Sequence, residues 1–383
     1  MTTIAHLAAM TPAKGQPFTL ETRPTPKPGP NDLLIAVKSV ALNPADNIMR
    51  DQGLFIPADT YPTVIGFDMS GLVLEAGANV PPSFKPNTRI AAYSASAWKS
   101  CDPDYGPFQE FCLVPWQHAV PLPDESTISW NHAATLPVAV QVPLSAWDAM
   151  GIPRTEMGVP QEGAGTRELP GPQTGPAQTP VRKSEALLIW GASSSVGTMG
   201  VQTARVLRDD PTSSFGAVYA TAGVANLEYV GQLGAERVFD YKDPRVVDLI
   251  FSAAQKDGLV VRFCFLATGL LGDCQAVLKR FRGEGITMAT SSKIASAPPV
   301  PQDAEDVDGV ETIFLMPSMV EEERLEQFRY WIGTWLRESL AKGLIKPSPK
   351  PSVVGKGLGA INGGLDKLFQ GVSCTKLVVE IAE

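Results

Sequence analysis

A buried apolar run that breaks into a turn of small residues constrains this chain more than any other feature. Residues 186–190 are Ala-Leu-Leu-Ile-Trp, and residues 191–197 follow as Gly-Ala-Ser-Ser-Ser-Val-Gly. The pattern predicts a strand, a tight turn and a helix that begins near Ser195. The first N–H groups of a helix lack partners within it and its dipole is positive at that end, so this turn is suited to a pyrophosphate.

Serines occupy positions 193–195, where glycines are more common in dinucleotide-binding turns, so the motif alone leaves open an ordinary strand-turn-helix. The residues that follow favour the nucleotide site. Helical patterns at 196–207, 226–233, 246–254 and 270–281 alternate with strand patterns at 217–221, 237–241, 260–266 and 285–290. Repeated β-α-β units predict a doubly wound parallel sheet, which binds dinucleotides where this motif lies.

The sequence on either side of this α/β region has a different character. The first 130 residues are rich in Pro and Gly, and short β-like runs at 33–40, 64–75, 89–93 and 108–114 predict a compact β-rich domain. Residues 151–183 are dominated by Pro, Gly, Gln and Thr, which predicts an insertion without a core. Beyond residue 310 we expect a strand at 311–315, a long helix at 321–342 and a last strand at 376–381.

Bulk composition fits a globular enzyme. A length of 383 residues suits two domains, 44% hydrophobic residues can form cores, and a net charge of −8 argues against nucleic-acid binding. No signal sequence is evident, and the apolar stretch 133–147 is interrupted by Pro137 and Pro143, so we expect a soluble cytoplasmic protein. The five cysteines show no paired spacing, which favours reduced thiols.

Several short segments, in order and spread over nearly the whole chain, carry a family resemblance. They are Val40-Ala41-Leu42-Asn43-Pro44-Ala45-Asp46, Gly66-Phe67-Asp68-Met69-Ser70-Gly71, Gly106-Pro107-Phe108-Gln109-Glu110-Phe111, Ala133-Ala134-Thr135-Leu136-Pro137, the nucleotide turn, Leu233-Gly234-Ala235-Glu236-Arg237-Val238-Phe239-Asp240-Tyr241 and Lys376-Leu377-Val378-Val379. The chain resembles the medium-chain dehydrogenase/reductase superfamily, in particular its zinc-independent quinone-oxidoreductase-like branch. Within that branch it resembles fungal trans-acting enoyl reductases that partner polyketide synthases.

This resemblance implies an α/β protein with two domains. A GroES-like β-rich catalytic domain would comprise residues 1–132 and 318–383. A Rossmann nucleotide-binding domain would comprise residues 133–317, including the insertion, and the cofactor would lie in the cleft.

The resemblance also bears on metal binding, because a catalytic zinc needs Cys or His ligands. Asn43 stands where zinc-dependent relatives carry a first cysteine, and Phe67 replaces the histidine of their Gly-His-Glu motif. The only histidines are His6, His118 and His132, which we interpret as surface or packing residues. We therefore expect no metal.

Without a metal, hydride addition to a conjugated C=C bond is favoured over alcohol oxidation. In the implied mechanism hydride passes to the β carbon and the α carbon is protonated. The proton donor is not evident from the sequence, so catalytic residues are left unassigned. Asp46 and Asn47 are the nearest polar side chains by motif position, but Asp46 is equally suited to holding its loop through local hydrogen bonds.

The family's contacts transfer residue by residue. Those implied for the cofactor are Ala45, Asp46, Asn47, Ser193, Ser194, Ser195, Val196, Gly223, Val224, Ala225, Asn226, Tyr241, Ser373 and Cys374. Tyr241 either flanks the adenine or its ribose, or simply packs, and Cys374 is interpreted as a wall residue. Those implied for an acyl substrate are Pro143, Leu144, Trp147, Met150, Leu315 and Met316.

Four positions depart from the family pattern. Ile48 replaces a lysine, and Val142 replaces a threonine near the nicotinamide. Gly223 and Gly231 stand where a serine and a lysine would grip a 2′-phosphate, which removes the usual sign of NADP, yet the second strand has no acidic end, which is the usual sign of NAD. The resemblance implies NADPH, with NADH still open.

The sequence leaves several functions open. The first is an NADPH-dependent enoyl reductase acting on a carrier-bound polyketide, with a polyketide synthase as partner. The alternatives are a quinone or small-enone reductase, a nucleotide-binding homologue with altered or lost catalysis, and an enzyme that processes a released intermediate. We expect no nucleic-acid or membrane partner, and the strand at 311–315 leaves both a monomer and a homodimer open.

Overall fold

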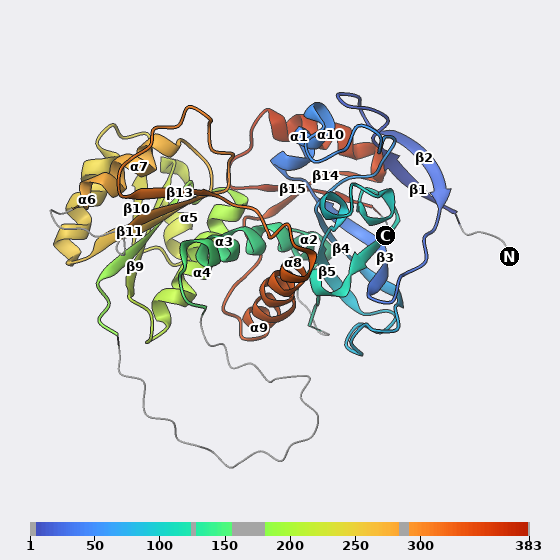
Figure 1. Ribbon diagram of the computed structural model, residues 1–383, viewed down its shortest axis with the longest axis horizontal. Coiled ribbons are helices and arrows are strands. Elements are labelled where there is room, and N and C mark those ends of the chain that lie inside the picture. Colours follow the sequence, from blue (N-terminus) through green and yellow to red (C-terminus); the bar gives the residue numbers. More distant parts are fainter. Residues whose placement is uncertain (1–4, 124–127, 155–180, 283–290, 382–383) are drawn as a thin grey trace, which may run out of the picture. The chain divides into compact units, whose positions relative to one another are not determined.

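The computed structural model describes residues 5–123, 128–154, 181–282 and 291–381 (Figure 1). The chain divides into two compact units. The first comprises Met1–Val142, Ser193–Met199 and Met316–Glu383, and the second comprises Pro143–Ala192 and Gly200–Leu315. Two helices, α3 (Pro137–Met150) and α4 (Ser195–Asp209), begin in the first unit and continue in the second.

The second unit is built on a six-stranded sheet in the order β10-β9-β8-β11-β12-β13, and all its strand pairs are parallel. Its elements are β8 (Glu185–Trp190), β9 (Phe215–Ala222), α5 (Leu227–Gln232), β10 (Arg237–Asp240), α6 (Val246–Asp257), β11 (Val260–Leu266), α7 (Leu271–Arg280), β12 (Ser292–Ser296) and β13 (Val310–Phe314). The doubly wound parallel sheet predicted from the sequence is confirmed. The strand expected at 285–290 lies outside the described residues, and β12 was not predicted.

Alternating side chains of this sheet pack on opposite faces, as strand geometry requires. Leu188 and Trp190 of β8 join a core with α6 and α7, the yellow and orange helices of Figure 1. On the other face, α4 approaches closely at Gly200, where an added Cβ would lie 2.9 Å from the Phe265 ring and 3.4 Å from Ile189. Only a residue without a side chain allows this helix to lie so near the strands.

The first unit contains a seven-stranded sheet in the order β14-β15-β3-β4-β5-β7, with β6 paired to β3, and a separate β1-β2 ladder. Its strands are β1 (Ala5–Met10), β2 (Thr19–Pro24), β3 (Asp32–Ala41), β4 (Asp68–Ala76), β5 (Arg89–Tyr93), β6 (Phe111–Pro115), β7 (Ala119–Pro121), β14 (Pro351–Lys356) and β15 (Lys376–Glu380). Because β15 pairs with β3, the two ends of the chain meet in one sheet.

Helices complete the first unit. They are α1 (Pro44–Gln52), α2 (Trp130–Ala134), α8 (Glu321–Phe328), α9 (Arg337–Ala341) and α10 (Ile361–Phe369). The long helix predicted at 321–342 is present, but a π-helical stretch over Arg329–Leu336 separates α8 from α9. That stretch buries Trp331 and Trp335, so the wider turn accompanies the packing of bulky side chains.

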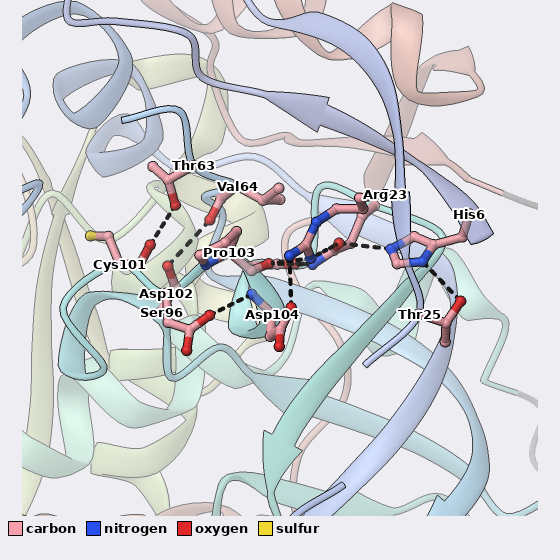
Figure 2. A network of polar contacts seen from close by, with 12 residues as sticks. His6, Arg23, Thr25, Thr63, Val64, Ser96, Cys101, Asp102, Pro103 and Asp104 are labelled. Atoms are coloured by element: carbon pink, nitrogen blue, oxygen red, sulfur yellow. Dashed lines mark hydrogen bonds and ion pairs between the residues drawn. The ribbon is translucent and has the colours of Figure 1, made fainter. Parts of the chain in front are cut away.

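A polar network ties the β1-β2 ladder to the loop before β6 (Figure 2). Arg23 donates to the Pro103 carbonyl at 3.0 Å and forms an ion pair with Asp104 at 2.7 Å. It also donates to Gln109 Oε1, which in turn lies 2.9 Å from His6 Nε2. The contacts hold His6 in a structural position, buried and hydrogen-bonded on both ring nitrogens.

Cysteines 101, 112, 264, 274 and 374 are all free thiols. Within the described part of the chain, no helix combines the length and apolar character needed to cross a lipid bilayer.

Candidate functional site

The turn after β8 is shaped by a close backbone approach. Gly191 has φ +78°, and a Cβ added there would lie 2.4 Å from the Thr268 carbonyl oxygen. The Gly191 N–H donates to Thr221 Oγ1 at 3.0 Å, and the Ala192 N–H donates to the Thr221 carbonyl at 2.8 Å. Neighbouring strand β9 therefore fixes the path of the turn, and a glycine is required at its start.

Helix α4 begins at Ser195, as predicted. The Ser194 hydroxyl accepts a hydrogen bond from the Gly197 N–H at 3.1 Å, which caps the helix. By helix geometry the N–H groups of Ser195 and Val196 have no carbonyl one turn back. Ser195 Oγ is also buried and has no hydrogen-bond partner among the described residues. These donors, together with the helix dipole, fit the pyrophosphate of a dinucleotide.

The segment after β9 and the end of β10 lie close together in the second unit. Val224 is 70% exposed and Tyr241 is 46% exposed. A Cβ added to Gly223 would lie 3.8 Å from Tyr241 Cε1, so the Tyr241 ring borders the space that the missing side chain leaves. This arrangement suits the predicted role of Tyr241 beside an adenosine group.

Lys242 adds a positive charge beside that ring, which the sequence interpretation missed. Its Nζ lies 5.7 Å from the centre of the Tyr241 ring. The available signal was a lysine directly after the tyrosine that follows a strand.

Asp46 holds its own loop, as one of the two interpretations predicted. Its Oδ2 accepts a hydrogen bond from the Asn43 N–H at 2.7 Å, so it ties the third residue of α1 to the residue before the helix. Burial raises the pKa of the Asp46 carboxyl to about 7. Its Oδ1 is buried without a hydrogen-bond partner among the described residues.

Asn47 presents a second unpartnered acceptor. Its Nδ2 donates to the Leu365 carbonyl of α10 at 3.0 Å, and its Oδ1 is buried with no partner in the described part of the chain. Ala45, also a predicted contact, is half-buried in the same turn. Buried polar atoms without partners cost free energy, so their presence here fits polar groups on a bound molecule.

Ser373 and Cys374 lie just before β15. Ser373 is exposed, and Cys374 is half-buried with φ +50°. The predicted contacts Ala45, Asp46, Asn47, Ser193, Ser194, Ser195, Val196, Ser373 and Cys374 belong to the first unit, and Gly223, Val224, Ala225, Asn226 and Tyr241 belong to the second.

The predicted acyl-pocket residues are mostly packed within the second unit. Pro143, Leu144, Trp147 and Met150 of α3 are buried, and Trp147 Nε1 donates to Thr203 Oγ1 at 3.2 Å. Leu315 is half-buried and belongs to the second unit, whereas Met316 is 38% exposed and belongs to the first. Their role in binding an acyl chain stays a prediction.

The residues at the expected zinc-ligand positions make other contacts. Asn43 Nδ2 donates to Asp68 Oδ2 at 3.0 Å, and Phe67 packs edge-on against Tyr93 with ring centres 5.8 Å apart. Lys376 Nζ forms an ion pair with Asp68 and donates to Asn43 Oδ1. The fixed cation beside Asn43 is therefore an ammonium group.

The other histidines are held by packing or capping. His118 stacks on Phe328 with ring centres 3.9 Å apart, and burial lowers its pKa to about 3. His132 lies 2.8 Å from the Ser129 hydroxyl at the start of α2. Across the described ranges, no three His, Cys, Asp or Glu side chains gather as metal ligands do.

The fold and the turn at residues 191–197 define the class of protein to which the chain belongs. Residues 29–124 match the alcohol dehydrogenase GroES-like domain. The whole fold is similar to that of an alcohol dehydrogenase superfamily protein from Novosphingobium aromaticivorans, with a TM-score of 0.70 and 19% identity over 98% of this chain and 100% of that one. A GroES-like domain joined to a Rossmann domain is the architecture of medium-chain dehydrogenases/reductases, and the predicted fold class is confirmed.

Full-length relatives define the family more narrowly. The trans-enoyl reductase tndF of Aspergillus flavipes is 38% identical over 98% of this chain and 99% of its own. The trans-enoyl reductase tazE of Aspergillus terreus is 38% identical over 83% of this chain and 94% of its own. The chain belongs to this family of fungal trans-enoyl reductases, so it is an oxidoreductase of the medium-chain superfamily, which implies a nicotinamide cofactor.

Proposed function

We propose that the protein is an NADPH-dependent, zinc-independent reductase of activated C=C bonds. It acts in trans on an unsaturated acyl intermediate of a polyketide synthase. One observation supports a reaction without zinc. The Lys376 ammonium is hydrogen-bonded to Asn43, which stands where zinc-dependent members of the superfamily carry a zinc ligand, and it is paired with Asp68. The printed names of the full-length relatives support the choice of an enoyl substrate.

When bound, the nicotinamide supplies the hydride. The chain's residues bind and orient the cofactor. The N–H groups of Ser195 and Val196 and the Ser195 hydroxyl bind the pyrophosphate of the cofactor. The buried oxygens Asp46 Oδ1 and Asn47 Oδ1 form hydrogen bonds with its nicotinamide end.

Lys242 supports the choice of NADPH. Its ammonium lies 5.7 Å from the Tyr241 ring, which borders Gly223, so a positive charge is available near the predicted adenosine site. Strand β9 ends in Ala222, and Gly223 follows it, so this strand end offers no carboxylate to the ribose hydroxyls that NAD-specific enzymes bind.

Purified protein, NADPH and α,β-unsaturated thioesters test the function. We expect loss of absorbance at the nicotinamide band, with a higher kcat/KM for a carrier-bound thioester than for the free one, because remote contacts with the carrier contribute binding free energy. No turnover of any thioester, free or carrier-bound, contradicts the proposal. Turnover of quinones or small enones alone identifies the protein as a stand-alone reductase, and tight NADPH binding without turnover identifies a non-catalytic homologue.

A further inference from the structure

A buried ion pair lies next to two of the segments that are predicted to bind the cofactor. Lys376 Nζ is 3.0 Å from Asp68 Oδ2, and the two side chains are 4% and 0% exposed. Asp68 is the first residue of β4 and Lys376 is the first residue of β15. Removing both charges from water is costly, and such a pair persists where additional hydrogen bonds satisfy its remaining atoms.

Those additional hydrogen bonds come from separate segments. Asn43, just before α1, donates its side-chain N–H to Asp68 Oδ2 at 3.0 Å and accepts from Lys376. The Val138 N–H, in the first turn of α3, donates to Asp68 Oδ1 at 2.7 Å. The Asp68 carboxylate therefore joins the beginnings of α1, α3 and β15 within the first unit.

Two of these segments adjoin predicted cofactor contacts. Asn43 accepts the Asp46 N–H at 2.9 Å and is followed by Ala45, Asp46 and Asn47. Lys376 comes two residues after Cys374. The Leu42 N–H donates to the Leu377 carbonyl at 2.9 Å, and these two residues adjoin Asn43 and Lys376 in the sequence.

We propose that Asp68 and Lys376 are positioning residues, whose buried ion pair holds the segments 43–47 and 373–376 in fixed register for binding the nicotinamide end of the cofactor. The proposal rests on the proposed function, since the two segments are predicted contacts. Neither residue touches the reacting atoms in this role. The effect of the pair is transmitted through Asn43 and through the start of β15.

A matched control lies on the same two strands. Lys356 of β14 forms an ion pair with Glu380 of β15 at 3.3 Å, with side chains 70% and 31% exposed. The parallel register places this pair at the far end of the β14-β15 ladder from Lys376. It adjoins no predicted contact, so Lys356→Met removes a lysine from the same ladder without disturbing the buried cluster.

The test compares variants of the full chain. Lys376→Met leaves Asp68 buried without its partner and is expected to melt lowest, whereas the double variant Asp68→Asn/Lys376→Met removes both charges and keeps the fold. In the double variant we expect the Kd and KM for NADPH to rise about 10-fold to 100-fold, with kcat changed less. Lys376→Arg should recover most of the affinity, and Lys356→Met should match the wild type.

A folded double variant with wild-type Kd, KM and kcat overturns the proposal. Hydrogen exchange of the free proteins supplies a readout that does not depend on turnover. We expect faster exchange in peptides covering 42–47 and 373–378 of the double variant and unchanged exchange in Lys356→Met. If the wild type binds no NADPH, the proposed function fails. Unchanged exchange in both peptides then overturns the positioning role separately, because it shows that the pair does not hold these segments.

Discussion

Asp46 is a fully buried carboxyl whose pKa rises from 3.8 to about 7, chiefly because burial disfavours its charge. The Asn43 hydrogen bonds and the Lys376 charge lower this pKa, whereas Asp68 raises it. Tyr93 is a further titratable group near Asp46 and Asp68, and burial raises its pKa above the usual range. The charged groups of the α1-α10 contact, Arg50, Asp51 and Asp366, pair with one another.

The pH dependence of stability follows from the sign of this shift. Between pH 3.8 and about 7 the native protein holds a proton on Asp46 that the unfolded chain releases. The stability that this proton provides is complete below pH 3.8, the pKa in the unfolded chain. It is lost as the pH rises through about 7, the pKa in the native protein. Asp46→Asn keeps an acceptor for the Asn43 N–H but has no charge to bury.

We therefore expect the melting temperature of Asp46→Asn to increase relative to that of the wild type as pH rises from about 5 to about 8. The gain should be roughly 1–2 °C for each kcal/mol that the ionised carboxyl costs. Melting curves of both proteins across this range check the prediction. Parallel pH profiles would show that Asp46 ionises in the native state as easily as in the unfolded one.

Gly191 has both a positive φ and a close backbone neighbour, whereas Gly258 has the positive φ alone and provides the control. Both have positive φ, +78° and +69°, but an added Cβ would meet the Thr268 carbonyl at 2.4 Å only at Gly191, and nothing within 4 Å at Gly258. Gly258→Ala should cost about 1–2 kcal/mol through backbone strain alone. Gly191→Ala should cost more and also weaken NADPH binding, because the phosphate turn must move. Urea unfolding and cofactor titration measure the two effects, and equal losses in both variants would contradict the close-approach argument.

At the scale of elements, the end of β10 carries the prediction on cofactor choice. Lys242→Met removes the ammonium beside Tyr241, and we expect the KM for NADPH to rise about 3-fold to 10-fold while that for NADH stays unchanged. Arg245→Met is the matched control, because Arg245 is a nearby cation that pairs with Asp243 at 3.0 Å. Equal effects on the KM values for NADPH and NADH would show that Lys242 does not recognise the 2′-phosphate.

Elements with strong apolar patterns were predictable from the sequence, and those with buried polar residues were not. The six-stranded sheet of the second unit has apolar strands such as β8, which is buried along its full length. Helix α1 instead buries Asp46, Asn47 and Arg50, so its periodicity is hidden. Strand β2 is exposed at nearly every residue and therefore shows no alternation. Helix α10 contains Gly363 and Gly364, which are poor helix formers.

Within the candidate site, the turn at residues 191–197 was predictable from the sequence, whereas the ion pair between Asp68 and Lys376 was not. The small residues 191–197 indicated a phosphate-binding turn because that signal is local. Lys376 and Asn43 are 333 residues apart, and no local pattern marks them as partners. The one available signal was a lysine at the start of an apolar strand, Lys376-Leu377-Val378-Val379, which demands a buried partner if the strand is central.

For the whole molecule, we expect folding and cofactor binding to be linked. The first unit brings β15 from the end of the chain against β3 from its beginning, and Ser193–Met199 joins it from the middle. Predicted cofactor contacts lie in Ser193–Met199, just after β3 at residues 45–47, and just before β15 at Ser373 and Cys374. A ligand that binds only when these segments are assembled stabilises the native state by mass action.

NADPH at about 100 times its Kd should stabilise the native protein by about 2.7 kcal/mol. The melting temperature should then rise roughly 3–5 °C, because a chain of this size shifts by roughly 1–2 °C for each kcal/mol. NADH at the same concentration should give a smaller rise, since it lacks the 2′-phosphate that Lys242 would contact. Gly191→Ala, with its phosphate turn displaced, should lose most of the rise and so serves as the control. Equal shifts with NADPH and NADH would rule out the preference, and the absence of any shift with either cofactor would rule out a preformed dinucleotide site.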